Sequence, residues 1–74
     1  MGMENTSLKT QLGARIARLR TLTGLSRTTF ALMIGVSRQY LADIEKGEAN
    51  ATVVMLERIA GGLGMSVEDL FYDL

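Results

Sequence analysis

Three polar side chains within a short stretch of the chain have the chemistry needed to read the edges of nucleic-acid bases. Arg38 carries a forked guanidinium that can donate two hydrogen bonds to a guanine, and Gln39 carries an amide that can donate one bond to an adenine and accept another. Asp43, about one helical turn further on, would accept from the amino group of a cytosine, or would instead pair with Arg38 or Lys46. We therefore predict a base-reading set of Arg38, Gln39 and Asp43.

A second group of polar residues is suited to contacts with a phosphate backbone. Arg27 follows Ser26, a good helix N-cap, so its charge would lie beside backbone N–H groups that already favour an anion. A solvated Arg27 is the alternative. Tyr40 would contact a phosphate or a thymine methyl group, or would cover the contact between two helices. The predicted backbone-contacting residues are Ser26, Arg27, Ser37, Tyr40, Lys46 and Asn50.

Start and stop signals place these residues on two short helices. Ser26 predicts a helix over residues 27–34, and Gly35 predicts its end because glycine adopts the left-handed conformation at little steric cost. Ser37 predicts a second helix over residues 38–46. Only Val36 separates Gly35 from Ser37, so the two helices must cross steeply, which is a helix-turn-helix. The outward side of the second helix is predicted to carry Arg38, Gln39, Ala42, Asp43 and Lys46.

Apolar residues at helical spacing predict three further helices. The core positions expected in the first are Leu8, Leu12, Ile16, Leu19 and Leu22, and those expected after the N-cap Thr52 are Val53, Leu56, Ile59, Ala60 and Leu63. Gly61 and Gly62, in the last turn of that helix, would permit close packing. Ser66 opens the last helix, whose apolar face would comprise Val67, Leu70, Phe71 and Leu74. We expect a flexible N-terminus over residues 1–7 and one domain over residues 8–74, with the helix-turn-helix at about 26–46.

The chain resembles the lambda-repressor-like helix-turn-helix family, the Cro/cI or xenobiotic-response-element group. The resemblance covers nearly all of residues 8–71, without an insertion, and rests on Leu19, Arg20, Gly24, Leu25, Ser26, Ala31, Gly35, Val36, Ser37, Leu41, Ile44, Glu45, Gly47, Leu56, Ile59, Ala60, Leu63, Leu70 and Phe71. It implies an all-α, five-helix DNA-binding domain and a structural ion pair between Arg20 and Glu45. Many members dimerise through their last helix, which implies an interface comprising Leu70, Phe71, Tyr72 and Leu74.

Two regions depart from the family pattern. Arg27 and Thr29 stand where members often carry the Gln and Glu of an N-terminal capping box, so the helix start is expected to depend on Ser26 and on Leu25 packing against Phe30. Glu48 lies in a loop where relatives commonly carry basic residues, which predicts a modest affinity for DNA.

Composition excludes several classes of function. The 74 residues include no His and no Cys, which excludes the usual zinc sites and a Ser–His or Cys–His catalytic pair, so we expect no enzyme, no metal and no cofactor. The net charge is zero, but residues 1–46 carry seven basic and three acidic side chains, whereas residues 47–74 carry one and five. This polarity suits a protein that binds DNA by one face. No apolar run approaches the roughly 18 residues of a membrane span, and a cytoplasmic protein is expected.

These observations predict a sequence-specific regulator of transcription that binds double-stranded DNA as a homodimer and represses by occluding a promoter. The alternative is an antitoxin, which would bind a toxin protein and regulate its own operon. The zero net charge and Glu48 favour the antitoxin slightly, whereas the shortness of the chain outside the domain disfavours it.

Overall fold

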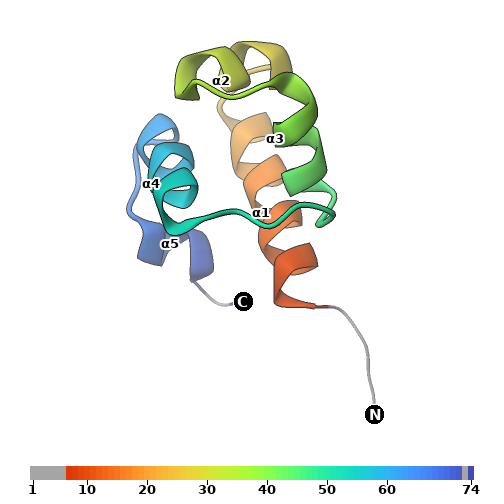
Figure 1. Ribbon diagram of the computed structural model, residues 1–74. Coiled ribbons are helices and arrows are strands. Elements are labelled where there is room, and N and C mark those ends of the chain that lie inside the picture. The colour runs from red at the N-terminus through yellow and green to blue at the C-terminus, as the bar shows by residue number, and fades with distance from the viewer. Residues whose placement is uncertain (1–6, 73) are drawn as a thin grey trace.

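The computed structural model describes residues 7–72 and 74, and it confirms the predicted all-α architecture. Within those residues the chain forms five helices and no strand: α1 (Leu8–Leu22), α2 (Arg27–Ile34), α3 (Arg38–Glu45), α4 (Val53–Gly62) and α5 (Val67–Phe71). Figure 1 shows α2 across the top of the molecule, α3 beside α1, and α4 with α5 on the other side. The helix α1 contacts both α3 and α5, so it links the helix-turn-helix to the C-terminal part of the fold.

Every helix begins at a hydroxyl residue whose side chain accepts a hydrogen bond from the backbone N–H three positions later. This bond satisfies one of the free donors of the first turn. The N-caps are Ser7, Ser26, Ser37, Thr52 and Ser66. The flexible segment predicted over residues 1–7 lies outside the described residues apart from Ser7, which caps α1. The helix α3 ends at Glu45, and Lys46 is its C-cap rather than its last residue.

The turn between α2 and α3 has the predicted geometry. Gly35 has a φ of 77°, in the left-handed region, and its N–H donates to the carbonyls of Ala31 and Leu32. A side chain at Gly35 would strain the backbone, so glycine allows the chain to leave α2 and enter α3 within three residues.

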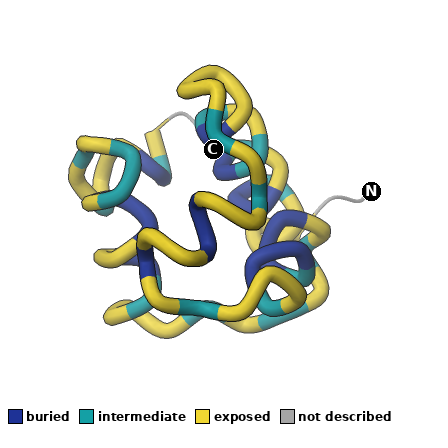
Figure 2. Tube along the Cα trace, turned by 90° about the horizontal axis from the view of Figure 1, so that it is seen from above, coloured by how far each residue is buried: buried dark blue, intermediate teal, exposed yellow. Residues whose placement is uncertain are grey.

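A single apolar core lies between the helices. Figure 2 shows the buried parts of the chain turned inward and the exposed parts around them. Its buried members come from all five helices: Leu12, Ile16, Phe30, Ala31, Ile34, Leu41, Ile44, Leu56, Ile59, Ala60 and Leu70. Three residues predicted for the core, Leu8, Leu22 and Val53, are exposed instead. They lie at the ends of α1 and α4.

Two glycines allow helices to approach more closely than the apolar pattern predicts. A Cβ at Gly13 in α1 would collide with the carbonyl oxygen of Ile44 at the end of α3. A Cβ at Gly62 would lie 2.8 Å from Cγ2 of Ile34 and 2.9 Å from Cε1 of Phe30. The expectation of close packing at the end of α4 therefore holds for Gly62, whereas a Cβ at Gly61 would meet no atom within 4 Å.

A hydrogen bond from α1 fixes α5. Arg15 donates through Nη2 to the carbonyl of Asp69 at 2.9 Å. Asp69 also accepts from the N–H of Ser66 in a reciprocal capping box, and this bond holds the pKa of Asp69 below its ordinary value.

Candidate nucleic-acid interface

A buried carboxylate fixes the end of α3. Glu45 accepts a bidentate pair of bonds from Arg20, at 2.7 Å from Nε and 3.1 Å from Nη2. The side chains of Arg20 and Glu45 are only 11% and 2% exposed, and the pair implied by the family resemblance is therefore present and buried. Arg20 also donates through Nη1 to the carbonyl of Leu25, just before α2. One guanidinium thus joins α1, the entry to α2 and the end of α3.

Arg27 contacts the same carboxylate. Its Nε donates to Oε1 of Glu45 at 2.8 Å, so the residue predicted to clamp a phosphate is an ion-pair partner inside the protein. Its side chain remains 36% exposed, because it lies at the first turn of α2 on the molecular surface. The alternative, a solvated Arg27, does not account for this ion pair, which the sequence does not reveal because Arg27 and Glu45 lie 18 residues apart.

The two arginines decide the charge state of Glu45. Burial by itself raises the pKa of this carboxyl, but the hydrogen bonds and charges of Arg20 and Arg27 outweigh burial and lower the pKa below its ordinary value. Glu45 is therefore ionised at neutral pH and accepts from both arginines.

The outward side of α3 is narrower than predicted. Arg38 and Gln39 are exposed in its first turn, and Asp43 is half-buried one turn later. Ala42, expected on the outward side, is instead 5% exposed, because α3 packs against both α1 and α2. Gln39 donates through Nε2 to Oδ1 of Asp43 at 2.8 Å. The two ion pairs found among residues 7–72 and 74 both involve Glu45. Arg38 and Lys46 were the predicted ionic partners of Asp43, and neither forms an ion pair with it in the structure.

The predicted backbone-contacting residues lie around α3, and several already have partners. The hydroxyls of Ser26 and Ser37 accept from the N–H groups of Thr29 and Tyr40 as helix caps. The hydroxyl of Tyr40 donates to the carbonyl of Asn50 at 3.0 Å, while its ring packs against the core. Tyr40 therefore holds the loop between α3 and α4 against α3. The sequence did not reveal this bond, because it joins a helix to an irregular loop.

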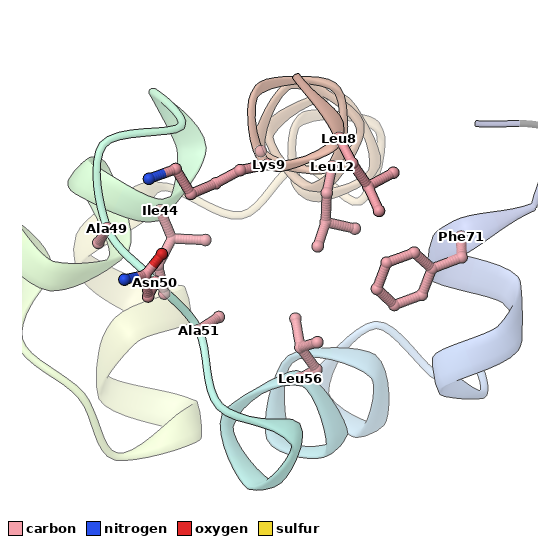
Figure 3. Close-up of a pocket in the computed structure, with 10 residues that line it drawn as sticks. Leu8, Lys9, Leu12, Ile44, Ala49, Asn50, Ala51, Leu56 and Phe71 are labelled. Atoms are coloured by element: carbon pink, nitrogen blue, oxygen red, sulfur yellow. The ribbon is translucent and has the colours of Figure 1, made fainter.

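The loop after α3 lies over an apolar hollow of about 230 Å³ (Figure 3). Leu12, Leu56 and Phe71 point into it, whereas Lys9 and Asn50 lie on the side of the loop. Lys46 and Asn50 are exposed, so their side chains are accessible to a backbone partner. Glu48, also exposed, places a negative charge between them.

The interface predicted for the last helix needs one correction. Leu70 is 0% exposed and belongs to the core of its own chain, because α5 packs against both α1 and α4. It is therefore inaccessible to a second copy. Phe71 is half-buried, whereas Tyr72 is 73% and Leu74 is 41% exposed. The accessible apolar surface at this end comprises Tyr72, Leu74 and part of Phe71.

No helix in the described part of the chain is long and apolar enough to cross a membrane. Residues 7–72 and 74 also contain no cluster of acidic side chains able to hold a metal ion.

Five capped helices, the tight turn at Gly35 and the buried Arg20–Glu45 pair define a lambda-repressor-like helix-turn-helix domain. The chain belongs to the helix-turn-helix family, whose model matches residues 16–70. It is 38% identical over 68 residues to the control protein C.MunI of Mycoplasma sp, an alignment that covers 90% of this chain and 92% of that protein.

Two further proteins show the range of the similarity. The crystal structure of the restriction-modification controller protein C.AhdI from Aeromonas hydrophila matches with a TM-score of 0.80 and 33% identity, covering 82% of this chain and 92% of that one. The immunity repressor of Bacillus phage phi105 is 39% identical over 56 residues, which cover 76% of this chain but 39% of the repressor.

Proposed function

We propose that this chain is a sequence-specific regulator of transcription that binds double-stranded DNA as a homodimer. The observation that carries the proposal is the pairing of an exposed first turn of α3, bearing Arg38 and Gln39, with a buried ion pair that fixes the other end of the same helix. A helix held in this way can enter the major groove without losing its orientation, and its N-terminal side chains reach the base edges.

The backbone contacts follow from the same placement. The first turn of α2, with Arg27 at the surface, would cross one phosphate strand, while Lys46 and Asn50 approach the other. The internal bond of Arg27 uses Nε towards Glu45, which directs the guanidinium without burying it. The negative charge of Glu48 repels phosphate on the side of the loop. We therefore propose that one copy binds DNA with modest affinity and that tight binding depends strongly on dimerisation.

The relatives suggest the kind of gene that is controlled. Two of them, a control protein and a restriction-modification controller, match over 92% of their own lengths. We therefore propose control of a restriction-modification operon, with repression by occlusion of the promoter as the output. No described contact favours the antitoxin alternative.

The direct test is selection of bound sequences from random duplex DNA by the purified protein, followed by sequencing. A palindromic motif with half-sites about one DNA turn apart would establish a dimeric, specific regulator. Lack of enrichment at moderate salt would contradict the proposal and would favour a protein partner such as a toxin.

Substitutions in α3 and at its C-cap should separate contacts with the bases from contacts with the phosphate backbone. Arg38→Ala should lose roughly 1–3 kcal/mol of discrimination at one base position. Lys46→Ala should instead weaken binding to all sequences and reduce the salt slope by about 1. Fluorescence anisotropy on the selected site and on single-base variants, at several salt concentrations, measures both. A uniform loss in Arg38→Ala would show that Arg38 is not a base reader.

A further inference from the structure

The side chain of Gln39 is held in a defined orientation by its neighbour one turn later. Its Nε2 donates to Oδ1 of Asp43 at 2.8 Å. An ionised carboxylate only accepts hydrogen bonds, so the NH₂ end of the amide, and not its oxygen, must face Asp43. The amide of an exposed glutamine is otherwise free to turn by half a rotation and exchange its donor and acceptor ends.

This orientation has a consequence for base recognition. A primary amide has two N–H groups, so Gln39 keeps one donor in addition to its Oε1 acceptor after bonding to Asp43. Adenine offers the complementary pair in the major groove, an N7 acceptor beside an N6 amino donor. Guanine offers two acceptors, N7 and O6, and would place O6 against the Oε1 of Gln39.

We infer that Asp43 is a positioning residue, which orients Gln39 for adenine and against guanine, and is not itself a base reader. The inference rests on the proposed function and deepens it by assigning the origin of one base preference. The placement of Asp43 supports it, since Asp43 is half-buried in the second turn of α3, whereas the first turn of a recognition helix supplies most base contacts. The sequence interpretation of Asp43 as a partner for cytosine is replaced by this role.

The test begins with the operator obtained by selection. Gln39→Ala identifies the position that Gln39 reads, because the adenine preference is lost there. At that position the unaltered protein should prefer adenine to guanine by roughly 5- to 150-fold, the range of one good bidentate contact. Asp43→Ala should reduce this preference to less than about threefold, although Gln39 is still present.

Two matched variants separate orientation from charge. Asp43→Glu keeps an acceptor-only group and should retain most of the adenine preference. Asp43→Asn offers both a donor and an acceptor, so the amide of Gln39 can turn, and an intermediate preference is expected. Asp43→Ala and Asp43→Asn both remove a negative charge near phosphate, so their binding to sites with guanine at that position should be equal or tighter, which a loss of folding would not produce.

A double-substitution cycle completes the experiment. In the Gln39→Ala background, Asp43→Ala should change no base preference, since there is no amide left to orient. An unchanged adenine preference in Asp43→Ala would overturn the inference while leaving the proposed function intact. So would the loss, in Asp43→Ala, of a preference at another base position that is equally large with and without Gln39, because Asp43 would then read that base itself. If the unaltered protein enriches no motif at all, the proposed function fails, and the inference fails with it.

Discussion

Glu45 is the residue on which the orientation of α3 depends. It is buried, it accepts from two arginines, and those arginines come from α1 and α2. A buried ion pair is weak support for net stability, because removing two charges from water costs about as much as their attraction returns. Its contribution here is geometric, since it fixes α3 relative to the two helices that surround it.

Removing one charged side chain from the cluster of Arg20, Arg27 and Glu45 should reduce the free energy of unfolding by far more than an intact ion pair contributes to it. Arg20→Ala leaves the carboxylate of Glu45 buried with only Arg27 beside it, and we expect a loss of about 3–5 kcal/mol in the free energy of unfolding. Arg27→Ala should cost less, on the order of 1 kcal/mol, because Arg27 is partly exposed and its ion pair is screened by solvent. Urea titrations of both variants measure the difference. Equal losses would show that Arg20 has no special structural role.

The lowered pKa of Glu45 predicts a pH dependence of stability. A carboxyl whose pKa is lower in the folded than in the unfolded chain binds fewer protons when folded. Its contribution is therefore complete at neutral pH and is lost as the pH falls from about 5 through the lowered pKa. Glu45→Gln removes this titration, so its free energy of unfolding should approach that of the unaltered protein as the pH falls. A gap that stays constant between neutral pH and the acid limit would contradict the assignment.

At the scale of the elements, α4 contains two adjacent glycines with different roles. Gly61 has open space where a Cβ would lie, whereas Gly62 lies against the buried ring of Phe30 and the side chain of Ile34. Helix propensity alone favours alanine at both positions. Packing reverses that preference at Gly62, because neither a buried aromatic ring nor a branched side chain can yield cheaply.

The two glycines therefore provide a matched pair of substitutions. Gly61→Ala should stabilise the protein by about 0.5–1 kcal/mol, and Gly62→Ala should destabilise it by roughly 1–3 kcal/mol. Thermal unfolding followed by circular dichroism measures both changes. Stabilisation by Gly62→Ala would mean that α2 and α4 are further apart than the structure shows.

At the scale of the whole molecule, one chain supplies its own core and leaves a small apolar surface at its end. Leu70 belongs to that core, while Tyr72 and Leu74 lie outside it. The charged side chains are also divided between the two parts of the molecule. The basic residues Arg38 and Lys46 lie in α3 and directly after it, whereas Glu68 and Asp69 lie in α5. Association through the C-terminal end would leave α3 of both copies free.

Substitutions at this end should separate folding from association. Leu70→Ala removes a fully buried side chain and should reduce the free energy of unfolding by about 2–5 kcal/mol. Tyr72→Ser changes an exposed residue and should shift the stability of a dilute monomer by no more than about 0.5 kcal/mol while weakening dimerisation. Sedimentation equilibrium and urea titration at several protein concentrations report the two effects. A Tyr72→Ser dimer as tight as that of the unaltered protein would place the interface elsewhere.

The helices and the turn could be predicted from the sequence alone, because they depend on contacts between residues close along the chain. Ser26 and Ser37 form caps with residues three positions away, and Gly35 requires only its own φ to end α2. The Gln39–Asp43 bond belongs to the same class, because a spacing of four residues places both side chains on one face of the same helix.

Which helix faces are covered, and which charged side chains meet, could not be predicted in the same way, because both depend on the packing of the helices. Periodicity indicates an apolar stripe but not its width. Ala42 was therefore predicted to face outward but is buried between α1 and α2, and Leu22 was predicted for the core but is exposed at a helix end. Arg27 contacts Glu45, and Gly13 lies against the carbonyls at the end of α3, because the packing of helices brings together residues far apart in sequence. Such contacts depend on the relative position of whole elements, which local spacing does not specify.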